Sequence, residues 1–161
     1  MNREEKLNLL IEIIQTLPKK RFNMGKWVEA TEESECGFAG CALGWATTSL
    51  VFQNMGLGVF TESLYNCDYD YTRIMFIDEY GHEWRDLDAG RQLFELNGEE
   101  AHFLFMPSSY TLYNGYGTRM YNWLEDQLDD SFFYKSRHTN ISTKKVIKRI
   151  EWVRDNPGVL K

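Results

Sequence analysis

Three cysteines and three histidines are the residues of this 161-residue chain whose types suit metal binding or nucleophilic catalysis. Cys36 and Cys41 are separated by four residues, which is wider than the two-residue spacing most common in zinc sites. Cys67 and His82 could complete a set of four ligands, but nothing in their spacing compels one. Free cysteines are often small buried hydrophobic side chains. The pattern therefore favours buried thiols, and we expect no metal and no other cofactor.

Cys36 is also a candidate nucleophile. It precedes a predicted helix, and the dipole and free N–H groups of a helix N-terminus lower the pKa of a thiol. His82, His102 or His138 could then serve as the base that such a site needs. Because no spacing ties these residues together, the sequence favours a protein that is not an enzyme. A thiol- or metal-dependent enzyme that uses Cys36 stays open as an alternative.

A nucleotide-like ligand is a third chemical possibility. Gly37 and Gly40 flank the predicted helix start, where exposed N–H groups could bind a phosphate or carboxylate. The Lys and Ser or Thr of a P-loop do not follow, and packing is the role that the sequence favours for these glycines. Aromatic rings could stack on a base, and arginines could contact phosphates. The candidate ligand-binding residues are Gly37, Gly40, Trp45, Arg73, Tyr110, Tyr113, Tyr116 and Arg119.

One segment, residues 36–48, is expected to position most of these candidates. It is dense in small residues, and its apolar positions from Ala39 to Leu50 fall at helical spacing. Gly40 and Gly44 are four residues apart, so on a helix they share one face that carries no side chains. Another element can approach such a face closely. We therefore predict a buried central helix from about residue 38 to 51.

The remaining elements follow from hydrophobic spacing and from capping residues. Asn97 with Glu100 three residues later predicts a capping box, and Ser142 is typical of a helix N-cap. The predicted helices lie before Pro18, from Asp86 or Asp88 to Leu96, from Asn97 to Pro107, at 118–128 and from Ser142 to Asn156, and the predicted hairpin joins 73–77 to 82–84. The expected fold is mainly α with a small β-hairpin, in one domain spanning residues 1–161.

Composition and charge argue against several classes of protein and partner. Hydrophobic residues make up 43% and charged residues 26%, which argues against disorder. The net charge of −6 argues against duplex DNA as a partner, because phosphate binding needs clustered Lys and Arg. Acid pairs such as Asp78 with Glu79 are expected to be surface charges. No apolar run has membrane-spanning length and no secretory signal opens the chain, so we expect a cytoplasmic protein with reduced thiols and no membrane partner.

Three motifs resemble a loose family of small uncharacterised proteins of tailed phages and bacteria. The motifs are Phe22-Asn23-Met24 with Trp27, Cys36-Gly37-x-x-Gly40-Cys41-Ala42-x-Gly44-Trp45-Ala46, and Leu93-x-x-Leu96-Asn97-x-Glu99-Glu100-Ala101-x-x-Leu104-Phe105-x-Pro107. The family shares a Cys-Gly-Thr-x-x-Cys-x-x-Gly-type core and a later Leu-Gly-Leu-Ser/Thr-x-x-x-Ala-x-x-Leu-Phe-type turn. This chain has Phe38 where Thr or Ser is usual, and Glu95 where Gly is usual. The resemblance implies a phage-type accessory role, which would place the protein in the host cytoplasm.

Three functions remain open from the sequence. The first is a non-enzymatic phage-type binding protein, such as a counter-defence inhibitor, that binds a host protein or sequesters a nucleotide-like signalling ligand. The second is a structural or regulatory interaction module without a small ligand, and the third is the enzyme that uses Cys36. The sequence leaves open whether the protein forms a homo-oligomer.

Overall fold

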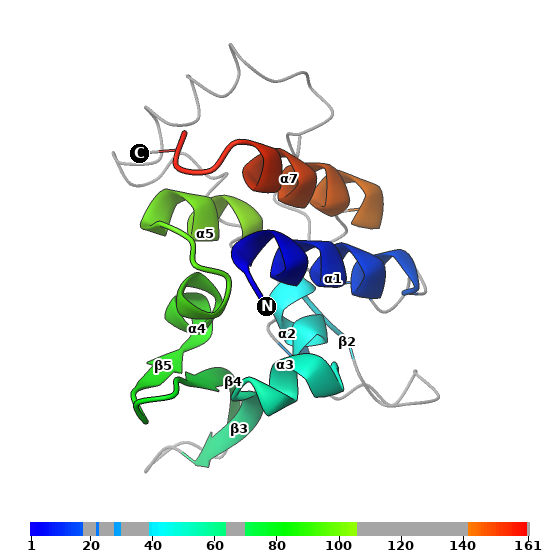
Figure 1. The fold of residues 1–161 in the computed structure, drawn as a ribbon. Coiled ribbons are helices and arrows are strands. Elements are labelled where there is room, and N and C mark those ends of the chain that lie inside the picture. The colour runs from blue at the N-terminus through cyan, green and yellow to red at the C-terminus, as the bar shows by residue number, and fades with distance from the viewer. Residues whose placement is uncertain (18–21, 23–27, 30–38, 64–69, 106–141, 161) are drawn as a thin grey trace, which may run out of the picture.

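The described chain is mainly helical, with a small three-stranded antiparallel sheet at one end (Figure 1). The structure is a computed structural model, and it describes residues 1–17, 22, 28–29, 39–63, 70–105 and 142–160. The predicted fold class, mainly α with a small hairpin, is confirmed. The predicted helix at 118–128 lies outside the described residues. Within the described parts, no helix is both long enough and apolar enough to cross a bilayer.

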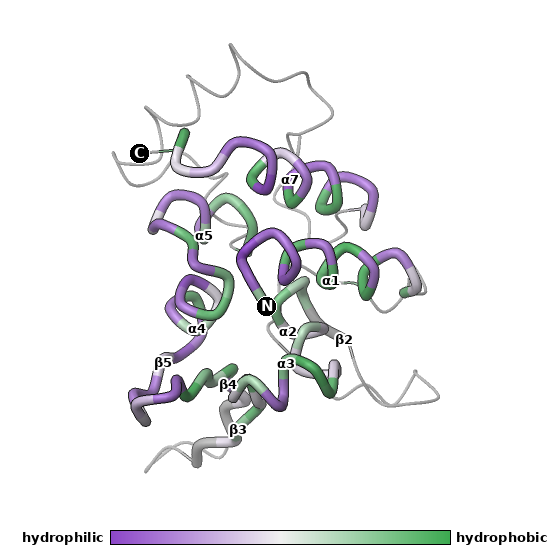
Figure 2. Tube along the Cα trace, viewed as in Figure 1, coloured by the Kyte–Doolittle hydropathy of each residue, from purple (hydrophilic) through white to green (hydrophobic). Residues whose placement is uncertain are grey.

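The first and last helices lie side by side at the end opposite the sheet (Figure 1). Helix α1 (Arg3–Gln15) begins with a capping box, in which Asn2 and Glu5 each bind the other's backbone N–H with their side chains. Helix α7 (Thr143–Asp155) begins at Ser142, as predicted. Hydrophobic and hydrophilic residues alternate along both helices in the helical repeat (Figure 2). Their apolar side chains without any exposed surface are Leu7, Leu10, Ile14, Val146, Ile150 and Val153.

Two helices in the middle of the chain connect the sheet to this pair. Helix α4 (Asp86–Leu93) packs against the sheet, and helix α5 (Gly98–Phe105) packs against α4 and α7. The capping box predicted before α5 is confirmed. Asn97 Oδ1 accepts from the N–H of Glu100, and the Glu100 carboxylate accepts from the N–H of Asn97, both at 2.9 Å.

The sheet is formed by three neighbouring strands in chain order, β3 (Leu57–Ser63), β4 (Asp70–Ile77) and β5 (Glu83–Arg85). Leu57 pairs with Phe76, and Phe76 pairs with Trp84. The predicted hairpin corresponds to β4 and β5 and is confirmed. Strand β3 was not predicted, because Gly58 and the adjacent apolar residues Val59 and Phe60 interrupt its alternation.

Aromatic rings fill the core between these elements. Phe94 lies between Phe52, with ring centroids 5.3 Å apart, and Phe105, with ring centroids 5.7 Å apart. All three side chains are fully buried. These three rings therefore stabilise the fold and are not part of a binding surface.

The predicted central helix from about residue 38 to 51 is wrong in its start and its continuity. Residues 39–40 form strand β2 (Ala39–Gly40), which pairs with β1 (Val28–Glu29). Two short helices follow, α2 (Ala42–Ala46) and α3 (Leu50–Asn54). Gly40 is therefore extended and shares no helix face with Gly44, although Gly44 is in a helix and buried as expected.

Local side-chain hydrogen bonds account for this break. Cys41 has an extended backbone and caps α2, because its Sγ accepts from the N–H of Gly44 at 3.4 Å. At the other end, the hydroxyl of Thr47 donates to the carbonyl of Gly44, and that of Thr48 donates to the carbonyl of Trp45. Side chains that bond to nearby backbone compete with helix continuation.

Candidate functional site: a groove between the first helix and the sheet

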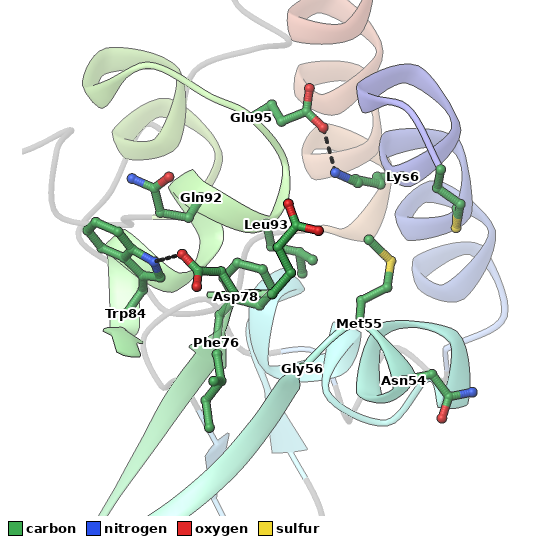
Figure 3. Close-up of a pocket in the computed structure, with 13 residues that line it drawn as sticks. Lys6, Asn54, Met55, Gly56, Phe76, Asp78, Trp84, Gln92, Leu93 and Glu95 are labelled. Atoms are coloured by element: carbon green, nitrogen blue, oxygen red, sulfur yellow. Dashed lines mark hydrogen bonds and ion pairs between the residues drawn. The ribbon is translucent and has the colours of Figure 1, made fainter. Parts of the chain in front are cut away.

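An open groove of about 710 Å³ lies between the start of α1 and the end of the sheet (Figure 3). Four segments line it: the start of α1, the turn from α3 to β3, the β4–β5 hairpin and the end of α4. Its apolar side chains include Met55, Phe76, Trp84 and Leu93. Its polar side chains include Lys6, Asp78, Glu79, Gln92 and Glu95. We call this site the groove from here on.

A close backbone contact fixes the base of the groove. Gly56 has a φ of +102°, a conformation that favours glycine, and its carbonyl accepts from the N–H of Ile77 at 3.0 Å. A Cβ atom at position 56 would collide with the carbonyl oxygen of Ile77. Only glycine therefore allows the α3–β3 turn to lie against the end of β4.

Asp78 organises the hairpin wall of the groove. One carboxylate oxygen accepts from the N–H groups of Tyr80 and His82, each at 2.9 Å. The other oxygen contacts His82 Nδ1 at 3.0 Å and accepts from the indole N–H of Trp84 at 3.3 Å (Figure 3). Partial burial raises the pKa of Asp78, but these hydrogen bonds outweigh it and lower the pKa to about 2. The groove therefore keeps an ionised carboxylate that also holds the Trp84 ring in place.

An ion pair forms the opposite wall. Lys6 Nζ lies 2.6 Å from Glu95 Oε1, with the lysine side chain 8% exposed and the glutamate side chain 57% exposed (Figure 3). Glu95 has a φ of +55°, in the left-handed region. This conformation costs a non-glycine residue about 1–2 kcal/mol. Backbone strain of this kind often marks functional sites.

Negative charge dominates the groove. Asp78, Glu79 and Glu95 contribute three carboxylates, whereas Lys6 contributes the one lysine or arginine side chain among the described lining residues. That ammonium group already contacts Glu95. Within the described part of the chain, the Glu79 carboxylate has no hydrogen-bond or ion-pair partner. The groove can therefore accept a cationic group more readily than an anionic one.

Three of the predicted ligand-binding residues are described, and these three lie outside the groove. Trp45 is buried in the core and is only 7% exposed. Arg73 Nη1 contacts Asp86 Oδ2 at 3.0 Å, and Gly40 lies in β2. None of these three residues lines the groove. The other candidates, Gly37, Tyr110, Tyr113, Tyr116 and Arg119, lie outside the described residues.

Cys41 is not suited to act as a nucleophilic thiol. This side chain is buried, as expected, and burial raises its pKa to about 11, so the thiol stays protonated. Cys36, Cys67 and His138 lie outside the described residues. In the part of the chain that is described, no three His, Cys, Asp or Glu side chains are grouped so that they could hold a metal ion.

The groove was not predicted from the sequence, because its walls are distant in the chain. Asp78 and Glu79 were expected to be ordinary surface charges of a turn. One signal was present: a turn acid is followed by rings at alternate positions, Tyr80, His82 and Trp84. An Asp at the start of a turn is typical of an Asx turn, in which its side chain accepts from the backbone N–H two residues on.

Comparisons with known proteins add no assignment: no protein-family model, no curated protein and no solved structure matches this chain.

Proposed function

We propose that this chain is a non-enzymatic binding protein and that the groove holds a segment of a partner protein. The observation that carries this proposal is the preformed groove itself, with apolar side chains beside a few fixed polar groups. Apolar walls supply burial area, and convergent polar groups orient what is bound.

A partner protein fits this groove better than a nucleotide-like ligand. Three carboxylates would repel phosphate groups, and Lys6 is already engaged by Glu95. The phage-type accessory role, with counter-defence as one form of it, rests on the resemblance and remains a prediction. An interaction module without a small ligand agrees with the same observations.

Selection of binding peptides from a randomised heptapeptide library tests the proposal. Asn54→Trp would place a large ring in the groove, whereas Leu50→Trp would place the same ring on α3 outside it, since Leu50 is 72% exposed and does not line the groove. We expect selected peptides to lose binding to Asn54→Trp and to keep it for Leu50→Trp. A library that yields no peptide blocked by Asn54→Trp, together with a thermal shift caused by cyclic dinucleotides or ADP-ribose, would favour the nucleotide alternative.

A further inference from the structure

We infer, on the basis of the proposed function, that the partner segment places an arginine side chain in the groove. The first argument is charge. The hydrogen bonds to Asp78 lower its pKa to about 2, so its carboxylate is ionised at neutral pH. Glu79 has no ion-pair partner among the described residues, and Glu95 is neutralised only by Lys6. A cation in the groove would offset the remaining negative charge.

The second argument is the arrangement of the carboxylates. Asp78 and Glu79 follow β4 on the hairpin wall, whereas Glu95 comes from the turn between α4 and α5. Figure 3 shows Asp78 and Glu95 on different walls of the groove. Asp78 already has two hydrogen-bond contacts at each oxygen, so the carboxylates with oxygens open to a new donor are Glu79 and Glu95. A planar guanidinium group has five N–H donors in a fixed fork, which is enough for more than one carboxylate. A lysine ammonium is a compact point charge and uses such an arrangement less fully.

The third argument is the apolar surface beside these charges. Phe76 and Leu93 line the same groove, and the indole N–H of Trp84 is bound to Asp78, which holds its ring in place. The aliphatic stem of an arginine packs well on apolar side chains while its head reaches polar groups. Arginine also stacks on aromatic faces. One arginine side chain therefore matches both the charged and the apolar parts of the groove.

The test uses the heptapeptides selected on the wild-type protein. We expect arginine to be enriched among those that Asn54→Trp blocks. Replacing that arginine by citrulline, its uncharged isostere, is expected to weaken binding at least about fivefold in isothermal titration calorimetry. The Glu79→Gln variant should bind the arginine peptide more weakly than wild type does and bind the citrulline peptide with unchanged affinity. Glu12 is exposed on α1 and lies outside the groove, so Glu12→Gln should change the affinity for neither peptide.

The outcomes separate this inference from the proposed function. Groove-binding peptides that lack arginine, or that bind equally well with citrulline, would overturn the inference and leave the proposed function intact. Peptides enriched in Asp or Glu would also overturn it. If no selected peptide is blocked by Asn54→Trp, both the proposed function and the inference fail.

Discussion

Asp78 shows how one carboxylate can order both a turn and a binding wall. It bonds to the backbone of the turn and to the side chains of His82 and Trp84. Its contribution to stability depends on the ionised form, because only the carboxylate accepts all of these hydrogen bonds. The same group therefore links the stability of the hairpin to the charge of the groove.

The lowered pKa of Asp78 predicts a stability difference that depends on pH. The folded pKa of about 2 lies below the ordinary value of 3.8, so the contribution is present above about pH 4 and is lost as the pH falls toward 2. Urea unfolding should show Asp78→Asn to be less stable than wild type at pH 6, with the difference shrinking below pH 4. A difference that stays constant from pH 6 to pH 2 would contradict this role.

Glu95 allows a test of the backbone strain at the groove. Glu95→Gly and Glu95→Ala both remove the ion pair with Lys6, but only glycine adopts a φ of +55° without strain. We expect Glu95→Gly to be more stable than Glu95→Ala by about 1 kcal/mol in urea unfolding. Equal stability of the two variants would show that position 95 is not held in the left-handed region.

At the scale of elements, one glycine sets how closely the helices pack. A Cβ built at Gly90 on α4 would lie 2.8 Å from the ring of Phe105 on α5 and 3.0 Å from Leu43 on α2. From the sequence, such a contact was expected at Gly40 and Gly44 together. That pair does not share a helix face, and the close contact at Gly90 was not predicted.

Two glycine-to-alanine substitutions separate packing from helix propensity. Alanine is favoured over glycine inside a helix by about 1 kcal/mol, so a helical glycine without close neighbours should tolerate it. Gly98, at the start of α5, has open space where the alanine methyl group would lie, whereas Gly90 does not. Thermal unfolding should show Gly98→Ala as neutral or stabilising and Gly90→Ala as destabilised by about 1–3 kcal/mol. A neutral Gly90→Ala would contradict the close contact.

Local signals were enough to predict several elements. Three of these signals depend only on residues within one or two helical turns. They are the apolar face of α1, the capping box of Asn97 and Glu100, and the N-cap at Ser142. The central helix predicted from about residue 38 to 51 was wrong in its start and its continuity, because side-chain bonds of Cys41, Thr47 and Thr48 to nearby backbone competed with helical spacing. The groove needed tertiary contacts such as that between Lys6 and Glu95, 89 residues apart, which no local pattern contains.

At the scale of the whole molecule, a buried carboxylate joins distant segments. Glu100 is 1% exposed and accepts from Arg3 at 2.9 and 3.2 Å and from the N–H of Gly158 at 2.8 Å. Burial raises the pKa of this carboxyl group, but the hydrogen bonds from Arg3 and the backbone outweigh it and lower the pKa. Asn97 adds a bond from its amide to the carbonyl of Leu160. These contacts hold α1, and with it Lys6, in place beside the α4–α5 turn that carries Glu95.

The most direct measurement of the central claim is an NMR titration of the tryptophan indole N–H signals with a selected peptide. Trp84 lines the groove and bonds to Asp78, whereas Trp152 packs on Phe103 away from it. Each signal can be assigned from a Trp→Phe variant. We predict that the Trp84 signal shifts and saturates while the Trp152 signal stays constant. Saturable shifts at Trp152 with an unchanged Trp84 signal would show that the protein binds its partner elsewhere.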